Sequence, residues 1–486
     1  MAKKEPTVSW QVLLDDAHWE QEAAAPTTQS ESARPRIRWV PQRRWVVLGA
    51  LLLAVAIGAA GVFFWQRAQN GLAAMQQEIQ DAVVLGESPQ ARQNPFLAAA
   101  LLDPKADPAW RAAIVDGLIQ DISLAPVATV QRVELAEGSA LAHLLITDPD
   151  FPLPSRVVRF YRDDGAGWLR TTPVSSFWGP AETWEGEHFL FRYYQRDRAA
   201  VLAAGPRMEA VYLQMRRELG LAILPVRRVV VVDPDDQPPT FDPSTGSGHR
   251  FPTGELRHPS PSLLPLPVGI AEESALYRSL IAYLVGELVR ESFDRYAYGE
   301  AWMWSNLTES ALRNWLLLKN GAVEMDLRIL IPWLLDGEAQ MARQLPDGLA
   351  AECQLLDGLA MQVLLLSCTP DIHASLPSRF PVTRLSRLIT TYDFDFTRDA
   401  SASTNPSGPM WRTETRREIV VATTVFLYAA ETYGVERLPA LLEALGDYRS
   451  WLEILPAAYG VTAEEFEEGW RQWLAQEFGV GSEATR

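Results

Sequence analysis

The sequence predicts an α+β protein with a single transmembrane helix, and three patterns support this prediction. Residues Trp45 to Trp65 form an uncharged, apolar run that matches the roughly 20 residues needed to cross a bilayer. Apolar and polar residues alternate through 127–172, which is typical of antiparallel strands. From Glu272 onward the apolar residues follow a helical period. These patterns predict a membrane helix, a small α+β domain and a larger, mostly helical part.

The residues around the apolar run predict its orientation. Tryptophan stands at both ends of the run, as in the aromatic belts of membrane interfaces. Five arginines precede it and one closely follows it: Arg34, Arg36, Arg38, Arg43, Arg44 and Arg67. The positive-inside rule therefore places the N-terminus in the cytoplasm. Because a long segment precedes a full-length span, an uncleaved signal anchor fits better than a cleaved signal peptide. We expect a single-pass cell-membrane protein whose C-terminal domains are extracytoplasmic.

Residues 1–44 are predicted to be a cytoplasmic tail that is largely disordered, because they are rich in Ala, Pro, Ser, Thr and Arg. One amphipathic piece, Val8 to Trp19, stands out within the tail. It predicts either a docking site for a cytoplasmic partner or a transient helix on the membrane surface. Its apolar side chains are Trp10, Leu13, Leu14 and Trp19.

Charge and cysteine content exclude several classes of protein. The formal net charge is −17, although the segment up to Arg67 is net positive. The acidic part beyond Arg67 argues against nucleic acid and anionic lipid head groups as partners. Cys353 and Cys368 are the two cysteines of the sequence, which excludes a disulfide scaffold and a cysteine-based metal centre. The sequence leaves open whether they form one bridge or remain two buried thiols.

Helix-patterned residues and then strands make up the first domain, 71–180. Residues 71–121 have helical spacing, and the strands are predicted at Val127–Leu135, Ala140–Thr147, Arg156–Arg162 and Trp168–Thr172. This order, with Arg159-Phe-Tyr-Arg162 followed by Trp168-Leu-Arg170, resembles the NTF2-like fold. The resemblance implies a curved antiparallel sheet packed on helices.

A new pattern begins near Glu187 and defines the second domain, 187–478. It predicts a strand at His188–Tyr194, a helix at Arg198–Gly220 and a buried strand at Arg228–Val232. A loop rich in Pro, Asp, Gly and Ser follows, and then a short edge strand within Leu256–Leu263. Helices dominate the rest.

The second domain resembles the peptidase MA-like (gluzincin) superfamily of zinc metallopeptidases. The chain ends with Glu431-Thr-Tyr-Gly434, a leucine-rich helix, and the segment Tyr459 to Trp470, which is similar to the closing helices of bacterial members. The resemblance implies a mixed sheet, a helix that bears an HExxH motif and a second helix that supplies a glutamate ligand.

The motif helix, 274–290, departs from that pattern at both histidines. Gly286, Glu287 and Arg290 stand where a histidine, the glutamate and the second histidine are expected, and Glu309 stands where the third ligand is expected. Glycine offers no ligand, and arginine cannot lose its proton to become one. We therefore expect no catalytic residue, no metal and no cofactor here. Arg290 and Glu309 could pair and replace the metal as a link between helices. The alternative is that these residues are ordinary surface residues.

Other candidates for a site are weaker. No histidine pair has i, i+4 spacing on a predicted helix, the acidic loops match no calcium-binding loop, and Thr245–Gly248 is not a nucleophile elbow. The recurring tryptophans suggest either a ligand groove or helix packing. The residues considered are His188, His249, His258 and His373; Asp233, Asp235, Asp236, Asp393, Asp395 and Asp399; and Trp302, Trp304, Trp315 and Trp333.

The sequence therefore predicts a membrane-anchored protein with a catalytically degenerate metallopeptidase-like domain. Such a domain is expected to bind a peptide or envelope protein and to act as a binding or regulatory module at the cell envelope. The alternatives are an active zinc metallopeptidase with displaced ligands, a structural or assembly protein of the envelope, and a protein that signals through its tail.

Overall fold

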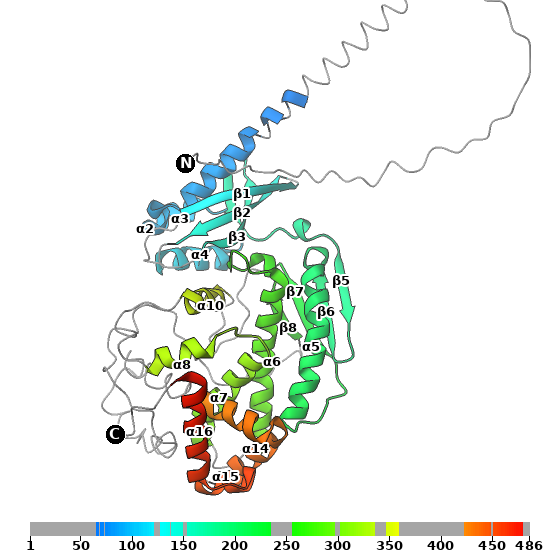
Figure 1. Cartoon of the computed structure of the whole chain (residues 1–486). Coiled ribbons are helices and arrows are strands. Elements are labelled where there is room, and N and C mark those ends of the chain that lie inside the picture. Colours follow the sequence, from blue (N-terminus) through cyan, green and yellow to red (C-terminus); the bar gives the residue numbers. More distant parts are fainter. Residues whose placement is uncertain are drawn as a thin grey trace, which may run out of the picture. The chain divides into compact units, whose positions relative to one another are not determined.

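The structure is a computed structural model, and its chain divides into two compact units (Figure 1). Unit 1 takes its residues from Met1–Ile122, Ala128–Leu144 and Arg159–Thr172, and unit 2 takes the others. The residues that the structure describes are 65–67, 69–71, 73–120, 127–136, 138–148, 153–234, 255–296, 302–335, 347–358, 422–448 and 451–479. The predicted tail 1–44, with Trp10, Leu13, Leu14 and Trp19, lies outside these ranges.

The fold class is α+β. Our prediction that it also includes a transmembrane helix was wrong for the described residues. None of their helices is both long enough and apolar enough to span a membrane. The physical reason is that long helices such as α5 (Arg198–Glu218) and α6 (Glu272–Tyr296) carry charged residues along their length. The run Trp45–Trp65 lies outside the described residues, except for Trp65. The predicted cell-membrane localisation stays a prediction.

Helices α2 (Pro89–Gln93), α3 (Pro95–Ala100) and α4 (Pro108–Gln120) belong to unit 1. Ser88 and Asn94 cap the first two, because their side chains accept hydrogen bonds from the first backbone N–H groups of each helix. Proline follows each cap, at the position where its missing N–H costs nothing. These signals divide the helical stretch into separate short helices.

The first sheet has the strand order β1-β2-β3-β4. Its strands are β1 (Val127–Ala136), β2 (Ser139–Thr147), β3 (Ser155–Asp163) and β4 (Trp168–Thr171). The four strands predicted from alternation are confirmed to within one residue at each end. Gly138 joins β1 to β2 with φ 74°, a conformation that glycine adopts without a steric penalty.

Asp103 fixes the segment before α4 to this sheet within unit 1. Its carboxylate accepts hydrogen bonds from Arg162 Nη1 at 2.8 Å and from Thr171 Oγ1 at 2.9 Å. Its backbone N–H also donates to Arg170 O at 2.7 Å. Because the carboxylate is buried, these bonds offset its loss of water.

Unit 2 contains a second, mixed sheet with the strand order β5-β6-β7-β8. Its strands are β5 (Ala181–Glu185), β6 (Phe189–Tyr194), β7 (Arg228–Asp233) and β8 (Glu255–Pro259). β5 pairs antiparallel with β6, whereas β6, β7 and β8 run parallel. Separately, β9 (Leu266–Pro267) pairs with Ser155 and Arg156 at the start of β3.

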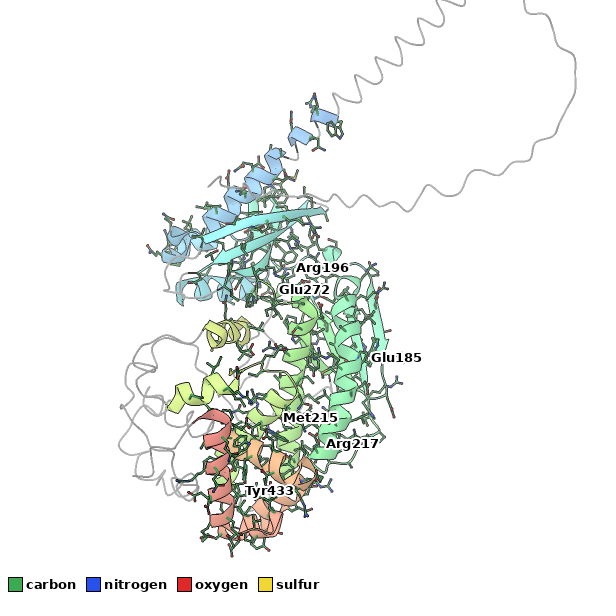
Figure 2. The ribbon with its side chains drawn as sticks, in the orientation of Figure 1. Glu185, Arg196, Met215, Arg217, Glu272 and Tyr433 are labelled. Carbon is green, nitrogen blue, oxygen red and sulfur yellow. The ribbon has the colours of Figure 1, made fainter. Side chains whose placement is uncertain are left out.

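Helices α5 and α6 run side by side and pack on this sheet (Figure 1). Their apolar faces meet strand side chains such as Phe191 and Val230 in one hydrophobic core. Arg196 and Glu272 are labelled at the end of the pair where both helices begin (Figure 2). Helix α7 (Trp302–Lys319) packs against α6 and contributes Leu312, Trp315 and Leu316 to the same core.

Further helices complete unit 2: α8 (Leu327–Leu335), α10 (Asp347–Gly358), α14 (Leu438–Asp447), α15 (Trp451–Tyr459) and α16 (Ala463–Phe478). Short 3₁₀ turns cover Ser175–Trp178, Gln195–Asp197, Pro261–Leu263 and Val435–Arg437. The last helix begins with a capping box between Thr462 and Glu465. Its Phe466 and Trp470 are fully buried.

Candidate functional site

Helix α6 carries the candidate site in its second half. Glu272 and Glu273 lie in its first turn, where negative charge is favourable. One face of the helix is apolar and enters the core. Gly286 and Glu287 lie on the partly buried side of the helix, whereas Arg290 is exposed. The predicted motif residues therefore occupy the boundary between core and solvent.

A cluster of charges occupies the place where the resemblance to gluzincins would put zinc. Glu309 on α7 lies close enough to Arg290 and Arg313 for both guanidinium groups to lower its pKa, but burial raises that pKa more. Burial likewise lowers the pKa of Arg313, and Glu309 opposes this. A Cβ atom added at Gly286 would lie 3.7 Å from Cζ of Arg313. The guanidinium of Arg313 thus fills the space in front of Gly286.

These residues do not fit a zinc ion. A tetrahedral zinc site needs neutral imidazoles, thiolates or carboxylates, whereas here two guanidinium groups interact with Glu309, and the second carboxylate nearby, Asp294, comes without an imidazole. Within the described ranges, no group of three or more His, Cys, Asp or Glu side chains is placed to hold a metal ion. Glu287, the glutamate of the predicted motif, therefore lies beside a cluster whose chemistry does not suit zinc.

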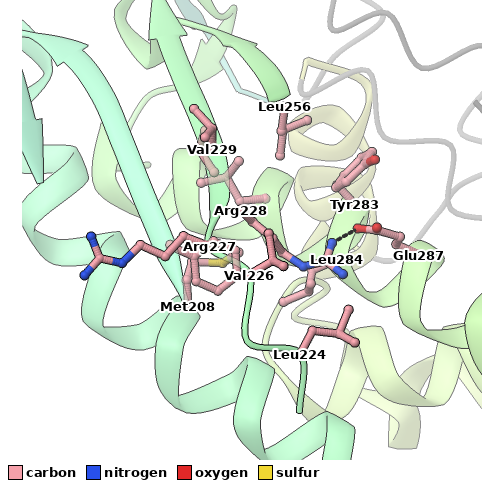
Figure 3. A pocket seen from close by; sticks show the side chains of 13 residues that line it. Met208, Leu224, Val226, Arg227, Arg228, Val229, Leu256, Tyr283, Leu284 and Glu287 are labelled. Carbon is pink, nitrogen blue, oxygen red and sulfur yellow. Dashed lines mark hydrogen bonds and ion pairs between the residues drawn. The ribbon is translucent and has the colours of Figure 1, made fainter. Parts of the chain in front are cut away.

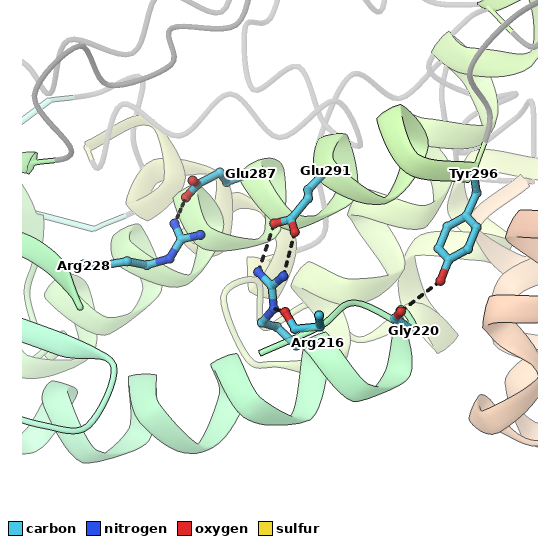
Figure 4. A network of polar contacts seen from close by, with 7 residues as sticks. Arg216, Gly220, Arg228, Glu287, Glu291 and Tyr296 are labelled. Carbon is cyan, nitrogen blue, oxygen red and sulfur yellow. Dashed lines mark hydrogen bonds and ion pairs between the residues drawn. The ribbon is translucent and has the colours of Figure 1, made fainter. Parts of the chain in front are cut away.

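Glu287 instead pairs with a residue that the sequence analysis did not select. Arg228 Nη1, at the start of β7, donates a hydrogen bond to Glu287 Oε2 (Figures 3 and 4). Burial lowers the pKa of Arg228, but its interactions with Glu287 and Tyr212 outweigh burial and raise this pKa overall. The guanidinium also lies 5.5 Å from the centroid of the Tyr212 ring. Arg228 is therefore a fixed, fully charged group.

A pocket of about 330 Å³ opens beside this ion pair, between α5, α6 and strands β7 and β8 (Figure 3). Its walls are mainly apolar, and Arg228, Tyr283 and Glu287 lie together at one side. The apolar lining consists of Phe189, Met208, Leu224, Val226, Val229, Val230, Leu256, Leu280 and Leu284. An apolar cavity of this size with a few convergent polar groups is typical of a site for a small ligand.

Tyr283 adds a hydrogen-bond donor to the pocket. Burial raises the pKa of its hydroxyl, and Glu287 raises it further, whereas Arg228 and Arg290 lower it. The hydroxyl is therefore protonated at neutral pH. Tyr283 and Glu287 are one helical turn apart on α6, which places them on the same face.

Two further contacts hold α6 in register with α5. Arg216 donates hydrogen bonds to both carboxylate oxygens of Glu291, and Tyr296 Oη donates to Gly220 O at 2.9 Å (Figure 4). Arg216 Nε also donates to Ala222 O at 2.6 Å. This last bond fixes the beginning of the segment 222–227, which forms one wall of the pocket.

The other residues considered from the sequence do not gather at this pocket. His258 is buried on β8, where its Nε2 lies 2.8 Å from Ser279 Oγ. His188 is buried with its ring 5.3 Å from that of Tyr212, and Asp233 pairs with Arg257 at 3.6 Å. Trp315 is part of the hydrophobic core.

Several candidates cannot be placed. His249, His373, Asp235, Asp236, Asp393, Asp395, Asp399 and Cys368 lie outside the described residues, and so do the side chains of Trp302, Trp304 and Trp333. Cys353 is buried.

Sequence reasoning missed Arg228 and Arg313, although each left a signal. Arg228 is a charged residue followed by four consecutive valines in its strand, where a charge needs a partner. Arg313 follows Glu309 at i, i+4 on α7, a spacing that brings side chains together. No family model, curated protein or solved structure matches the chain. The NTF2-like and gluzincin resemblances therefore stay predictions.

Proposed function

We propose that unit 2 is a binding module rather than an enzyme, and that its ligand occupies the pocket beside α6. The observation that supports this is the Arg228–Glu287 pair at the rim of an apolar cavity. In a purely structural protein, side chains would be expected to fill the space between the motif helix and the sheet. Here that space is open and carries a charged group, a hydroxyl and an apolar wall.

The charge cluster between α6 and α7 supports a binding role in a different way. Arg290, Glu309 and Arg313 interact with one another, and such a cluster can link α6 to α7 without a metal. A peptidase-like scaffold that keeps its cleft but lacks ligands for zinc would still bind an apolar peptide or envelope component. We propose that it does so at the outer face of the cell envelope, as its sequence predicts.

A neutral, apolar dye tests this proposal. We expect Nile red to bind the full-length protein and the Leu224→Glu variant to weaken binding by about tenfold, because a charge at the mouth opposes entry of an apolar ligand. Leu202→Glu is the matched control, since Leu202 is a similarly exposed leucine on α5 that does not line the pocket. Equal binding by both variants would contradict the proposal.

The competing proposal, a zinc peptidase with displaced ligands, makes a different prediction. Stoichiometric zinc in the purified protein, together with cleavage of a peptide library that Glu287→Gln abolishes, would establish it. Under the binding proposal, Glu287→Gln changes ligand affinity and no peptide is cleaved.

A further inference from the structure

We propose that the ligand of this pocket is an aliphatic monocarboxylate, whose chain fills the cavity and whose carboxylate replaces Glu287 on Arg228. This inference rests on the proposed function and specifies the chemistry of the ligand. It follows from the charge at the rim, from the way that charge is held, and from the apolar surface that surrounds the opening.

The positive charge at the rim is fixed, whereas its present partner can leave. Arg228 is anchored on a central strand, contacts the Tyr212 ring, and has a side chain that is 21% exposed. Glu287 is 34% exposed on the outer part of a helix, so its carboxylate can turn into water at little cost. Glu287 thus occupies the position that a ligand carboxylate would take.

The donors at the rim suit a single negative charge. Arg228 offers a planar guanidinium, which binds carboxylates through paired hydrogen bonds, and Tyr283 lines the same side of the pocket. The guanidinium of the neighbouring Arg227 points away from that of Arg228 (Figure 3) and pairs with Glu185 at 2.9 Å. One available guanidinium favours a carboxylate over a phosphate dianion, which would bring a second charge without a second cation.

The apolar part of the ligand is indicated by the pocket and by the segment next to it. The buried part of the lining includes the aliphatic side chains of Met208, Leu280 and Leu284, of which the unbranched methionine adapts most readily to an alkyl chain. Ile223, Leu224 and Val226 are 50%, 39% and 68% exposed. Apolar residues exposed side by side at a pocket mouth mark an interaction surface. The opening therefore favours an alkyl chain that extends out of the cavity and covers these exposed residues.

Competition between decanoate and Nile red on the full-length protein tests the inference, with 1-decanol as the uncharged match. We expect decanoate to displace the dye at a concentration about tenfold below that of decanol, because a charge-assisted pair contributes about that much. Glu287→Gln should strengthen decanoate binding several-fold, since it removes the competing carboxylate. Arg228→Met should abolish the preference for the acid while Nile red still binds. Glu182→Gln is the control and should leave decanoate binding unchanged, because neither Glu182 nor its partner Arg198 lines the pocket.

The outcomes separate this inference from the proposed function. If Nile red binds in the pocket but decanol competes as well as decanoate, or Glu287→Gln has no effect, the carboxylate inference is wrong and the binding module stands. If a peptide with a free C-terminal leucine competes with the dye and decanoate does not, the ligand is not an aliphatic monocarboxylate and the inference is likewise wrong. If Nile red does not bind at all, the proposed function itself fails.

Discussion

Arg216 donates two hydrogen bonds to Glu291, at 2.9 and 2.6 Å, and so joins α5 to α6 through a bidentate ion pair. The two partners differ in exposure, because the side chain of Arg216 is 1% exposed and that of Glu291 is 36% exposed. The charge that remains after removal of one partner therefore differs in its access to water. The buried guanidinium would remain without a counter-charge, whereas the carboxylate would remain partly in water.

We therefore expect Glu291→Ala to destabilise the protein more than Arg216→Met. An uncompensated buried charge costs about 3–5 kcal/mol, and the hydrogen bond from Arg216 Nε to Ala222 O offsets only part of this. Arg216→Met keeps an apolar stem and leaves a carboxylate that water can solvate, so we expect a cost of about 1–2 kcal/mol. Urea unfolding followed by tryptophan fluorescence measures both. Equal losses would show that the pair is not asymmetric.

Asp197 makes stability depend on pH. It is buried, and Ser260 Oγ donates a hydrogen bond to it at 2.6 Å. Burial raises its pKa to about 7 and Glu272 adds to the rise, although Ser260, Arg196 and Trp178 oppose it. Because the folded state holds a proton that the unfolded state releases near pH 4, stability falls as pH rises from about 4 to 7. The full effect is on the order of 4 kcal/mol.

The Asp197→Asn variant should lack this dependence, because asparagine mimics the protonated carboxyl. We expect the variant to match the wild type at pH 4 and to be more stable at pH 8. Unfolding curves at both pH values test this expectation. A variant that is less stable than the wild type at pH 8 would show that the ionised carboxylate is favoured in the folded state.

His258 acts in the opposite direction over nearly the same pH range. Burial lowers its pKa to about 4, and the Pro259 carbonyl opposes this only in part. The folded state keeps it neutral while the unfolded state takes up a proton below pH 6.5, so stability falls as pH decreases from about 6.5 to 4. In the Asp197→Asn background this acid destabilisation should stand alone, and His258→Gln should remove it. If the double variant keeps the same slope, another group causes it.

Local patterns predicted most of the strands and helices, because each depends on neighbours in sequence. The strand β5 was missed, since its Ala-Glu-Thr-Trp-Glu sequence carries one glutamate on each face and lies at a sheet edge. The limits of α6 were also too narrow, because the acidic residues before Ser274 belong to its first turn. Helix ends depend on capping, which periodicity does not show.

The candidate site was only half predictable, for a physical reason. Glu287 and Glu309 were selected because the motif is defined by spacings within one helix and between that helix and the next one in the sequence. Arg228 is 59 positions away from Glu287, and only the return of the chain through β7 brings the two together. The pocket likewise needs side chains from α5, α6, β7 and β8 at once. No local pattern specifies such a meeting.

The C-terminal segment that resembles a family motif has a structural explanation of its own. Thr462 Oγ1 accepts a hydrogen bond from Glu465 N, and the Glu465 side chain accepts one from Thr462 N. We expect Thr462→Ala to cost about 1 kcal/mol through loss of the cap. Trp470→Ala should cost about 3–5 kcal/mol, because Trp470 is fully buried and its indole N–H donates a hydrogen bond to Thr424 Oγ1. Thermal unfolding measures the loss of stability in each variant, and neither substitution should alter Nile red binding.

The gluzincin resemblance predicts that a zinc site can be introduced by substitution. If Gly286, Arg290 and Glu309 occupy the ligand positions, the variant Gly286→His, Arg290→His, Arg313→Ala should bind one Zn²⁺. The two histidines would lie at i, i+4 on one face of α6, and Arg313 must be removed because its guanidinium faces Gly286. Isothermal titration with ZnCl₂ measures the binding.

Two comparisons make this test specific to geometry. Restoring the histidines while keeping Arg313 should bind zinc at least about tenfold more weakly, because a nearby cation repels the metal and fills its space. Adding Glu309→Ala to the full variant should weaken binding to a similar extent, since it removes the third ligand. A folded full variant that binds no zinc would mean that α6 and α7 do not present these positions to a common point. The resemblance would then be one of helix order alone, and the Arg290–Glu309–Arg313 cluster would be an ordinary link between two helices.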